Sequence, residues 1–177
     1  MPPGLDLIVG SLPEPTRGYD PAMPSLADTE SYLHEHIPIS RALGVTVVRA
    51  DAGGVELRAP LAANINHRST VFGGSAISVA ILAAWTLVHL WTIDLERLGR
   101  YRVVIRRSEM DYRAPIQGDF SATCTPPPDV LDRFTRSLER HRTAPVDLTA
   151  RVSSGDIEAG SFAGSYVAIR LDGADPY

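Results

Sequence analysis

The feature that most constrains the fold is an uncharged segment in the middle of the chain. Between Gly73 and Ile93 there is no Asp, Glu, Lys or Arg, and His89 is the one ionisable side chain. Such a segment is long enough to cross a bilayer as a helix. However, small and polar residues dilute it, and its flanks have the pattern of strands without the cationic loops of a membrane protein. A helix that is apolar on all sides is also typical of a buried core helix. We therefore predict one long buried helix from 73 to about 96, and no membrane association.

Composition narrows the class of protein. The 177 residues suit one domain with a substantial core. A formal net charge of −4 argues against broad attraction to nucleic acid or anionic lipid. All 17 cationic residues are Arg, so Schiff-base lysine chemistry is excluded. The single Cys124 excludes an internal disulfide, and a free thiol fits a reducing cytosol. We expect a cytoplasmic protein.

Proline and periodicity divide the chain. Six of the 14 prolines lie in residues 1–25, which predicts an extended N-terminal arm ahead of one domain at 26–177. A helix is expected from about Asp28, capped by Asp28 or Thr29, to Pro38, with one further turn at 39–43. A short amphipathic helix is expected at 129–140, with Asp129 as its cap. Alternating or β-branched residues predict the strands 44–50, 55–60, 101–115, 119–125, 145–154 and 158–171.

The order of these elements indicates the architecture. Strands joined by short connections form an antiparallel sheet, and that sheet must bury the single long helix. The expected fold is α+β, with an antiparallel sheet wrapped around one apolar helix, which is the hotdog architecture. Within 101–115, period-two spacing places Val104, Arg106, Ser108, Met110 and Tyr112 on one face. The opposite face then carries Val103, Ile105, Arg107, Glu109, Asp111 and Arg113.

Three stretches together resemble a known family. They are "LHEHIPIS", "APLAANINHRSTVFGGS" and "VVIRRSEMDYRAP". Over about residues 31–170 they are similar to the thioesterase domain named after the YiiD C-terminal domain, within the hotdog superfamily. In the family's namesake this domain follows an acetyltransferase domain. Here the Pro-rich arm takes that place, so no acetyltransferase activity is expected.

A more distant similarity concerns the loop before the helix. "NHRSTVFGG" resembles the loop of PaaI-type acyl-CoA thioesterases, in which Asn is followed after a spacer by His-Gly-Gly and then by an acid on the helix. Asn66 matches that Asn, and Gly73 and Gly74 match the Gly pair. Phe72 stands where the His would be, and Ile81 where the acid would be. The resemblance therefore implies the fold but not the same mechanism.

The Gly pair is the first candidate for chemistry. Thioester hydrolysis requires hydrogen-bond donors for the negative charge that develops on the carbonyl oxygen. Backbone N–H groups at a helix start have no partner within the helix and lie at its positive end. Glycine lets a ligand approach them closely. We predict that the Gly74 amide, with that of Gly73 or Ser75, binds this oxygen. The alternative is that the glycines serve only close packing.

Four residues are candidates for activating or positioning water. His67 is a candidate base because imidazole titrates near neutrality, and Asn66 is a candidate for orienting water. A structural role in the loop is open for both. Glu109 is the next candidate base, with ion pairing to neighbouring Arg as the alternative. Ser108, on the face expected to meet the helix, is a candidate for binding water.

Substrate contacts are expected from residues on and beside the helix. Core filling is the default interpretation of Trp85 and Trp91, and an acyl tunnel lined by Phe72, Leu82 and Trp85 is the alternative. Ser75 and Arg106 are candidate polar contacts, the latter to a phosphate or carboxylate, or else a side chain that reaches solvent at the sheet edge. The other histidines do not have a metal-ligand spacing, so no metal site is predicted.

These residues lead to two functional hypotheses. The first is a thioesterase that cleaves an acyl-CoA or acyl-carrier-protein thioester by water attack, working as a homodimer or dimer of dimers. Coenzyme A or phosphopantetheine would then be part of the substrate, and no separate cofactor is expected. The second is a non-hydrolytic hotdog protein, either an acyl-thioester binding module or a dehydratase or lyase acting on a carrier-bound acyl chain.

Overall fold

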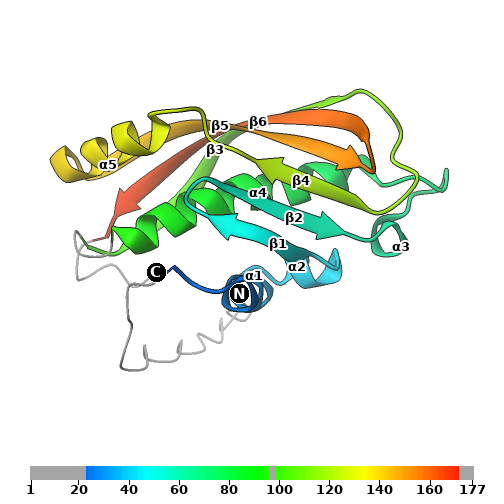
Figure 1. The fold of residues 1–177 in the computed structure, drawn as a ribbon, viewed down its shortest axis with the longest axis horizontal. Helices are drawn as coiled ribbons and strands as arrows, with labels where there is room; N and C mark the ends of the chain where they lie inside the picture. The colour runs from blue at the N-terminus through cyan, green and yellow to red at the C-terminus, as the bar shows by residue number, and fades with distance from the viewer. Residues whose placement is uncertain (1–22, 96–98, 172–177) are drawn as a thin grey trace, which may run out of the picture.

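Six strands form one antiparallel sheet that curves over a single long helix (Figure 1). The computed structural model describes residues 23–95 and 99–171. The strand order is β1-β2-β4-β5-β6-β3, and every neighbouring pair is antiparallel. The α+β hotdog architecture expected from the sequence is confirmed. Most of the predicted arm, 1–25, lies outside the described residues.

The strands agree with the predicted pattern to within a few residues. Their bounds are Thr46–Asp51 for β1, Gly54–Ala59 for β2, Tyr101–Tyr112 for β3, Phe120–Cys124 for β4, Thr143–Ser154 for β5 and Ile157–Arg170 for β6. Along β5 the burial alternates strictly, with Ala144, Val146, Leu148, Ala150 and Val152 buried. Strict alternation is what a strand shows when one face meets the core and the other meets solvent.

The first helix begins earlier than the sequence suggested. Helix α1 spans Leu26–His36, and Ser25 is its N-cap. The Ser25 hydroxyl accepts from the Asp28 N–H at 3.1 Å while the Asp28 carboxylate accepts from Ser25, which makes a reciprocal capping box. The prediction that Asp28 or Thr29 caps the helix is therefore wrong, because Asp28 occupies the third helical position. The expected further turn is α2, Ile39–Ala42.

Two local features differ from the prediction. A short helix, α3 (Leu61–Asn64), lies in what was expected to be loop. Helix α5 spans Val130–Arg140 as expected, but Asp129 does not cap it with its side chain. Asp129 has φ 63°, whereas a side-chain N-cap requires extended backbone. The left-handed conformation turns the chain sharply out of the preceding proline run.

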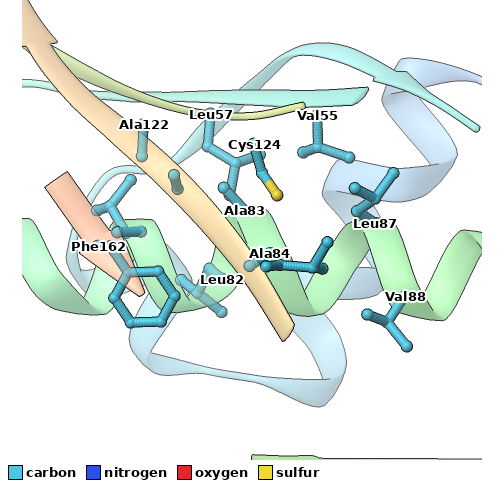
Figure 2. Close-up of a cluster of buried hydrophobic side chains, with 14 of the residues drawn as sticks. Val55, Leu57, Leu82, Ala83, Ala84, Leu87, Val88, Ala122, Cys124 and Phe162 are labelled. Atoms are coloured by element: carbon cyan, nitrogen blue, oxygen red, sulfur yellow. The ribbon is translucent and has the colours of Figure 1, made fainter. Parts of the chain in front are cut away.

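The uncharged segment forms helix α4, Gly73–Asp94. It is long and apolar enough to cross a membrane, yet 67% of its most apolar window is buried inside the fold. Its inward side chains include Leu82, Ala83 and Leu87, and sheet residues such as Leu57 and Phe162 pack on them (Figure 2). Small alanines bring the sheet close to the helix axis. This burial explains the lack of charge, so the prediction of a buried core helix is confirmed.

A bulge in β3 changes which side chains face α4. The pairing with β6 shifts between Ile105 and Arg107, so Arg106 is the extra residue. Beyond the bulge Met110 pairs with the buried Phe162, and before it Ile105 pairs with the buried Tyr166. The helix face therefore carries Tyr101, Val103 and Ile105 first, and then Ser108, Met110 and Tyr112. The prediction that one uninterrupted alternation places Val104 with Ser108 is wrong, since the bulge reverses it.

Candidate active site at the start of the central helix

Helix α4 begins with backbone donors that have no partner. Phe72 precedes it in an extended conformation, and its side chain makes no cap. The N–H groups of Ser75 and Ala76 donate to the Phe72 carbonyl at 2.9 and 3.1 Å. The N–H groups of Gly73 and Gly74 find no acceptor among the described residues. Two free donors therefore lie at the positive end of a 22-residue helix.

The two glycines are surrounded differently. A Cβ on Gly73 would lie 3.4 Å from the Tyr112 ring, which is ordinary contact. A Cβ on Gly74 would overlap the Phe72 ring, whose atoms are its three nearest neighbours. Phe72 is 59% exposed, so its ring covers Gly74 from the solvent side. Only a residue without a side chain fits beneath that ring as it stands, which agrees with both the catalytic and the packing interpretation.

Tyr112 is a site residue that the sequence reasoning missed. Its hydroxyl donates to the Gly73 carbonyl at 2.8 Å and so ties the end of β3 to the start of α4. Burial raises the pKa of Tyr112, which keeps the phenol protonated and disfavours a role as base. The signal was present in the motif "DYRAP". That motif carries the family resemblance, but its spacing does not reveal a contact with Gly73, which is 39 residues away.

A cavity of about 370 Å³ opens beside these groups. It is lined by Val71, Gly73, Ala76, Tyr112 and the turn 113–116. This volume suits a small-molecule group rather than a single water. No carboxylate or imidazole contributes to the lining among the described residues. Arg113 is the charged group, and it is engaged with Asp111 at 3.0 Å and with Glu158.

Asn66 organises the loop that leads to the helix. Its side-chain oxygen accepts from the N–H of Arg68 at 2.7 Å and of Thr70 at 3.3 Å. Its amide nitrogen donates to the Thr70 hydroxyl at 2.9 Å and to the Val71 carbonyl at 3.2 Å. Both ends of the amide are therefore occupied within the loop. His67, next along the chain, is exposed, and its side chain makes no hydrogen bond or ion pair within the described part of the chain.

Asn64, two residues earlier, is a second structural residue of this loop. It is buried, and its amide donates to the carbonyls of Leu43 and Pro60 at 2.8 and 2.7 Å. The backbone carbonyl of Asn64 accepts from the Phe72 N–H at 2.7 Å. Asn64 thus fixes where the chain enters α4. The sequence showed it only as one of several polar residues, because nothing in the spacing indicated which would be buried.

The candidates on β3 lie away from the helix start. Ser108 is on the helix face, four residues before Tyr112, so it is roughly 13 Å away along the strand. Glu109 points to the outer face, where it pairs with Arg107 at 2.7 Å and both side chains are largely exposed. Arg106 is exposed at the bulge. None of the three lines the cavity at Gly73.

The candidates on α4 divide by burial. Leu82 is 5% exposed and belongs to the core, as Figure 2 shows. Trp85 is half-buried and donates its indole N–H to the Val103 carbonyl at 3.2 Å. Ile81, where PaaI-type enzymes carry an acid, is half-buried, and its carbonyl accepts from the Tyr166 hydroxyl at 3.1 Å. Ser75, in the first turn, is buried.

The described residues contain no group suited to cysteine nucleophilic catalysis and no cluster suited to metal-ion catalysis. Cys124 is fully buried, and burial raises the pKa of its thiol to about 12, so it is not a nucleophile. Clusters of three or more His, Cys, Asp or Glu suited to a metal ion do not occur within 23–95 and 99–171.

Comparison with solved structures gives hotdog proteins. A protein of unknown function from Chlorobaculum tepidum is 28% identical, with a TM-score of 0.74 over 82% of this chain and 94% of that one. A putative thioesterase from Shewanella oneidensis is 25% identical, with a TM-score of 0.70 over 81% and 96%. A mutant of the phenylacetic acid degradation protein PaaI from Thermus thermophilus has a TM-score of 0.55 at 19% identity, over 76% and 99%, and shows the fold alone.

A family model identifies the chain more directly. The match runs over residues 26–170, which includes the loop, the helix start and the β3 tyrosine described above. These are also the segments on which the resemblance was based. The chain belongs to the hotdog family described as "Putative thioesterase (yiiD_Cterm)".

Proposed function

We propose that this protein hydrolyses an acyl-CoA or acyl-carrier-protein thioester by direct attack of water. The thioester carbonyl oxygen accepts from the N–H groups of Gly73 and Gly74. As water adds to the carbonyl carbon, negative charge grows on that oxygen, and the two donors with the helix dipole stabilise it. Collapse of the tetrahedral intermediate breaks the C–S bond. The products are a free acid and a thiol, with no acyl-enzyme.

The observation that carries this proposal is the pair of free amides beside a cavity. Gly73 contributes to the cavity wall, and the cavity is large enough for the reacting end of a thioester. The Tyr112 hydroxyl donates to the Gly73 carbonyl and thereby links the end of β3 to the first residue of α4. The donors are therefore held in place before the substrate arrives, which is what makes such donors effective.

His67 is the preferred candidate for the proton from water. The Asn66 amide is committed to the loop, and Glu109 is committed to Arg107 on the outer face. His67 is exposed on the same loop and retains both ring nitrogens for proton transfer. It directly follows Asn66, which fixes the turn of the loop that leads into α4.

We propose that the working unit is a homodimer formed through β3. This strand has 12 residues, and among residues 23–95 and 99–171 it pairs with β6 alone and leaves its other edge open. The opposite edge of the sheet is protected, because Glu30 of α1 accepts from the Val47 N–H of β1 at 2.8 Å. Ile105, on the helix face of β3, is 40% exposed. A second copy paired on β3 would cover it and would bring new side chains beside the helix start.

A cytoplasmic location is also proposed, from the free buried thiol of Cys124. Exposed arginines, Arg68 on the loop and Arg106 at the bulge, are proposed to meet the phosphates of coenzyme A or of a carrier's phosphopantetheine. No further cofactor enters the proposed reaction.

A non-hydrolytic function is the second candidate, and one observation favours it. The cavity at Gly73 has no acid or imidazole in its lining, and Ile81 replaces the helix acid of PaaI-type enzymes. A site with an oxyanion pocket but without a base would bind a thioester and leave it intact. A dehydratase acting on a carrier-bound 3-hydroxyacyl chain would use the same pocket.

The deciding experiment follows free thiol during incubation with acyl-CoA and acyl-carrier-protein panels. Thiol release above the uncatalysed rate, lowered in His67→Gln and retained in Glu109→Gln, supports the hydrolase. Measurable binding of acyl-CoA without thiol release would support the binding module. Loss of water from 3-hydroxyacyl substrates, detected by the ultraviolet absorbance of the enoyl product, would support the dehydratase. Either of the last two results overturns the hydrolase.

A further inference from the structure

A second cavity, of about 380 Å³, lies at the other end of α4. We call it the distal cavity. It is enclosed by α1, by the last turns of α4 and by the start of β3, and its apolar walls include Leu33, Leu90 and Ile93. One wall is a stack of rings in which Tyr32 and His89 are 4.5 Å apart and Trp85 and His89 are 4.8 Å apart. The volume falls in the range of ligand sites.

The Thr86 hydroxyl in the distal cavity has no hydrogen-bond partner among the described residues. Thr86 is 1% exposed, lines the cavity, and its hydroxyl makes no hydrogen bond. Two other lining threonines, Thr29 and Thr92, donate to backbone carbonyls, so Thr86 is different. His89 also lines the cavity, and burial lowers its pKa to about 4, so its imidazole is neutral. The lining also contains two charged residues, Asp28 and Arg100, which are both exposed, and the Asp28 carboxylate accepts from the Ser25 hydroxyl at 2.6 Å. The buried part of the cavity thus offers an unpaired hydroxyl and a neutral imidazole, which suit an uncharged group that carries an oxygen.

A half-buried stripe joins the two ends of α4. Residues at helical spacing along one face, Gly74, Ser78, Ile81, Trp85 and His89, are each partly exposed, while the rest of the helix is mostly buried. The sheet reaches this stripe where Trp85 donates to the Val103 carbonyl, and Tyr32 of α1 stacks on His89. Gly74 lies at one end of the stripe, and His89 at the other end lines the distal cavity.

The length of that path sets the length of the ligand. From Gly74 to Thr86 the helix rises about 18 Å. A fully extended chain covers roughly 1.2 Å per bond. The tail must therefore be about 15 bonds long to reach Thr86, which corresponds to a long-chain acyl group. An eight-carbon chain ends near the middle of the stripe and does not enter the distal cavity.

We propose that the distal cavity binds the end of a long acyl chain whose thioester lies at Gly73 and Gly74, and that Thr86 and His89 bind a hydroxyl or keto oxygen near the end of that chain. This inference rests on the proposed function, since it places the thioester at the helix start. It adds the substrate class: long-chain thioesters, with an oxygen on the tail.

The first experiment measures binding of thioether analogues, which have no carbonyl to hydrolyse. S-hexadecyl-CoA and S-octyl-CoA are titrated below the concentration at which they form micelles. Ile93→Trp fills the distal cavity, and Pro24→Trp narrows it from outside the helices in case the first variant folds poorly. Leu131→Trp is the matched control, because Leu131 is a half-buried residue of α5 outside the cavity.

Each buried methylene strengthens binding roughly fourfold, so displacing two or more weakens it at least about tenfold. We expect that loss for S-hexadecyl-CoA in both cavity variants, no change beyond about twofold for S-octyl-CoA, and wild-type binding in Leu131→Trp. Equal loss for both chain lengths, or no loss for the long one, would overturn the proposal. If the expected pattern appears while no thioester is hydrolysed, the distal cavity stands and the hydrolase does not.

A second comparison tests whether the distal cavity recognises an oxygen on the acyl tail. S-(16-hydroxyhexadecyl)-CoA is expected to bind wild-type protein about fivefold more tightly than S-hexadecyl-CoA, a gain typical of one hydrogen bond. Thr86→Val has nearly the same shape without the hydroxyl, and it should remove that preference. Equal affinity of wild-type protein for the two analogues would show that Thr86 and His89 do not recognise an oxygen.

Discussion

At the scale of single residues, Asn66 has a structural function that can be measured. Its amide makes four hydrogen bonds within residues 66–71. Asn66→Ala removes all of them and is expected to lower the free energy of unfolding by about 2 kcal/mol. Asn66→Asp keeps the two acceptor bonds and should lose about half as much. Urea unfolding checks this series, and an Asn66→Ala protein of unchanged stability would contradict it.

His89 should make stability depend on pH. Burial, with a smaller effect of His36, lowers its pKa to about 4 in the folded state, while the unfolded value is about 6.5. Between these values the unfolded chain takes up a proton that the folded chain refuses, so stability is lost as pH falls from about 6.5 to 4. Between pH 7.5 and pH 5, His89 alone is expected to lower the free energy of unfolding by about 2 kcal/mol.

His89→Phe keeps the stack with Tyr32 and Trp85 but cannot titrate. The difference in unfolding free energy between wild-type protein and His89→Phe should therefore be constant above about pH 7.5, where His89 is neutral in both states, and should shift by about 2 kcal/mol in favour of the variant at pH 5. Chemical unfolding at the two pH values measures this. A parallel pH dependence of the two proteins would mean that His89 is protonated in the folded state.

The sequence located the helix start well but not the roles around it. Gly73 and Gly74 stand where the pattern placed them, because a Gly pair before an apolar run is a local signal. The occupation of Asn66 and the burial of Asn64 depend on which carbonyls the loop meets, and those come from distant segments. Tyr112 was missed for the same reason, since its partner Gly73 is 39 residues away.

At the scale of elements, β3 and α4 are joined by the Tyr112 hydroxyl. Tyr112→Phe removes that bond and is expected to lower the free energy of unfolding by about 1 kcal/mol. The first turn of α4 should open more often, so the Ser75 and Ala76 amides should exchange their hydrogens faster. Hydrogen exchange followed by mass spectrometry or NMR tests this, with Tyr101→Phe at the far end of β3 as control. Unchanged exchange at the first turn would show that the bond does not hold the helix start.

Long periodic elements were predictable, and their irregularities were not. The absence of charge from Gly73 to Ile93 was sufficient for α4, and strict alternation was sufficient for β5. The bulge at Arg106 has no mark in the sequence, because it arises from the pairing of β3 with β6. Its effect was to reverse the faces assigned to the first half of the strand. The cap of α1 was predicted at Asp28 or Thr29, whereas Ser25 is the N-cap and Asp28 is its partner in a capping box.

At the scale of the whole molecule, the two edges of the sheet provide a matched pair of positions. Ile105 on β3 is 40% exposed and Val48 on β1 is 39% exposed. Ile105→Asp places a charge in the proposed dimer interface, and Val48→Asp places one at the protected edge. Light scattering after gel filtration should give about twice 19.1 kDa for wild-type protein and Val48→Asp, and the single-chain mass for Ile105→Asp. A wild-type monomer would contradict the dimer.

The proposed activity requires that the thioester reacts at the start of α4. Phe72→Ala removes the ring that a side chain at Gly74 would meet, so it creates space for a larger residue there. The double variant Phe72→Ala with Gly74→Val should therefore fold, and its valine blocks access to the two free amides. Circular dichroism and thermal unfolding confirm that both proteins are folded before activity is compared.

The most direct measurement is kcat/KM for thiol release from the best acyl-CoA substrate by these two proteins. Phe72→Ala is expected to retain most of the wild-type value. The double variant is expected to lose about 100-fold, as enzymes do when an oxyanion donor is lost. A double variant that is folded and as active as Phe72→Ala would contradict the placement of the thioester carbonyl at Gly73 and Gly74.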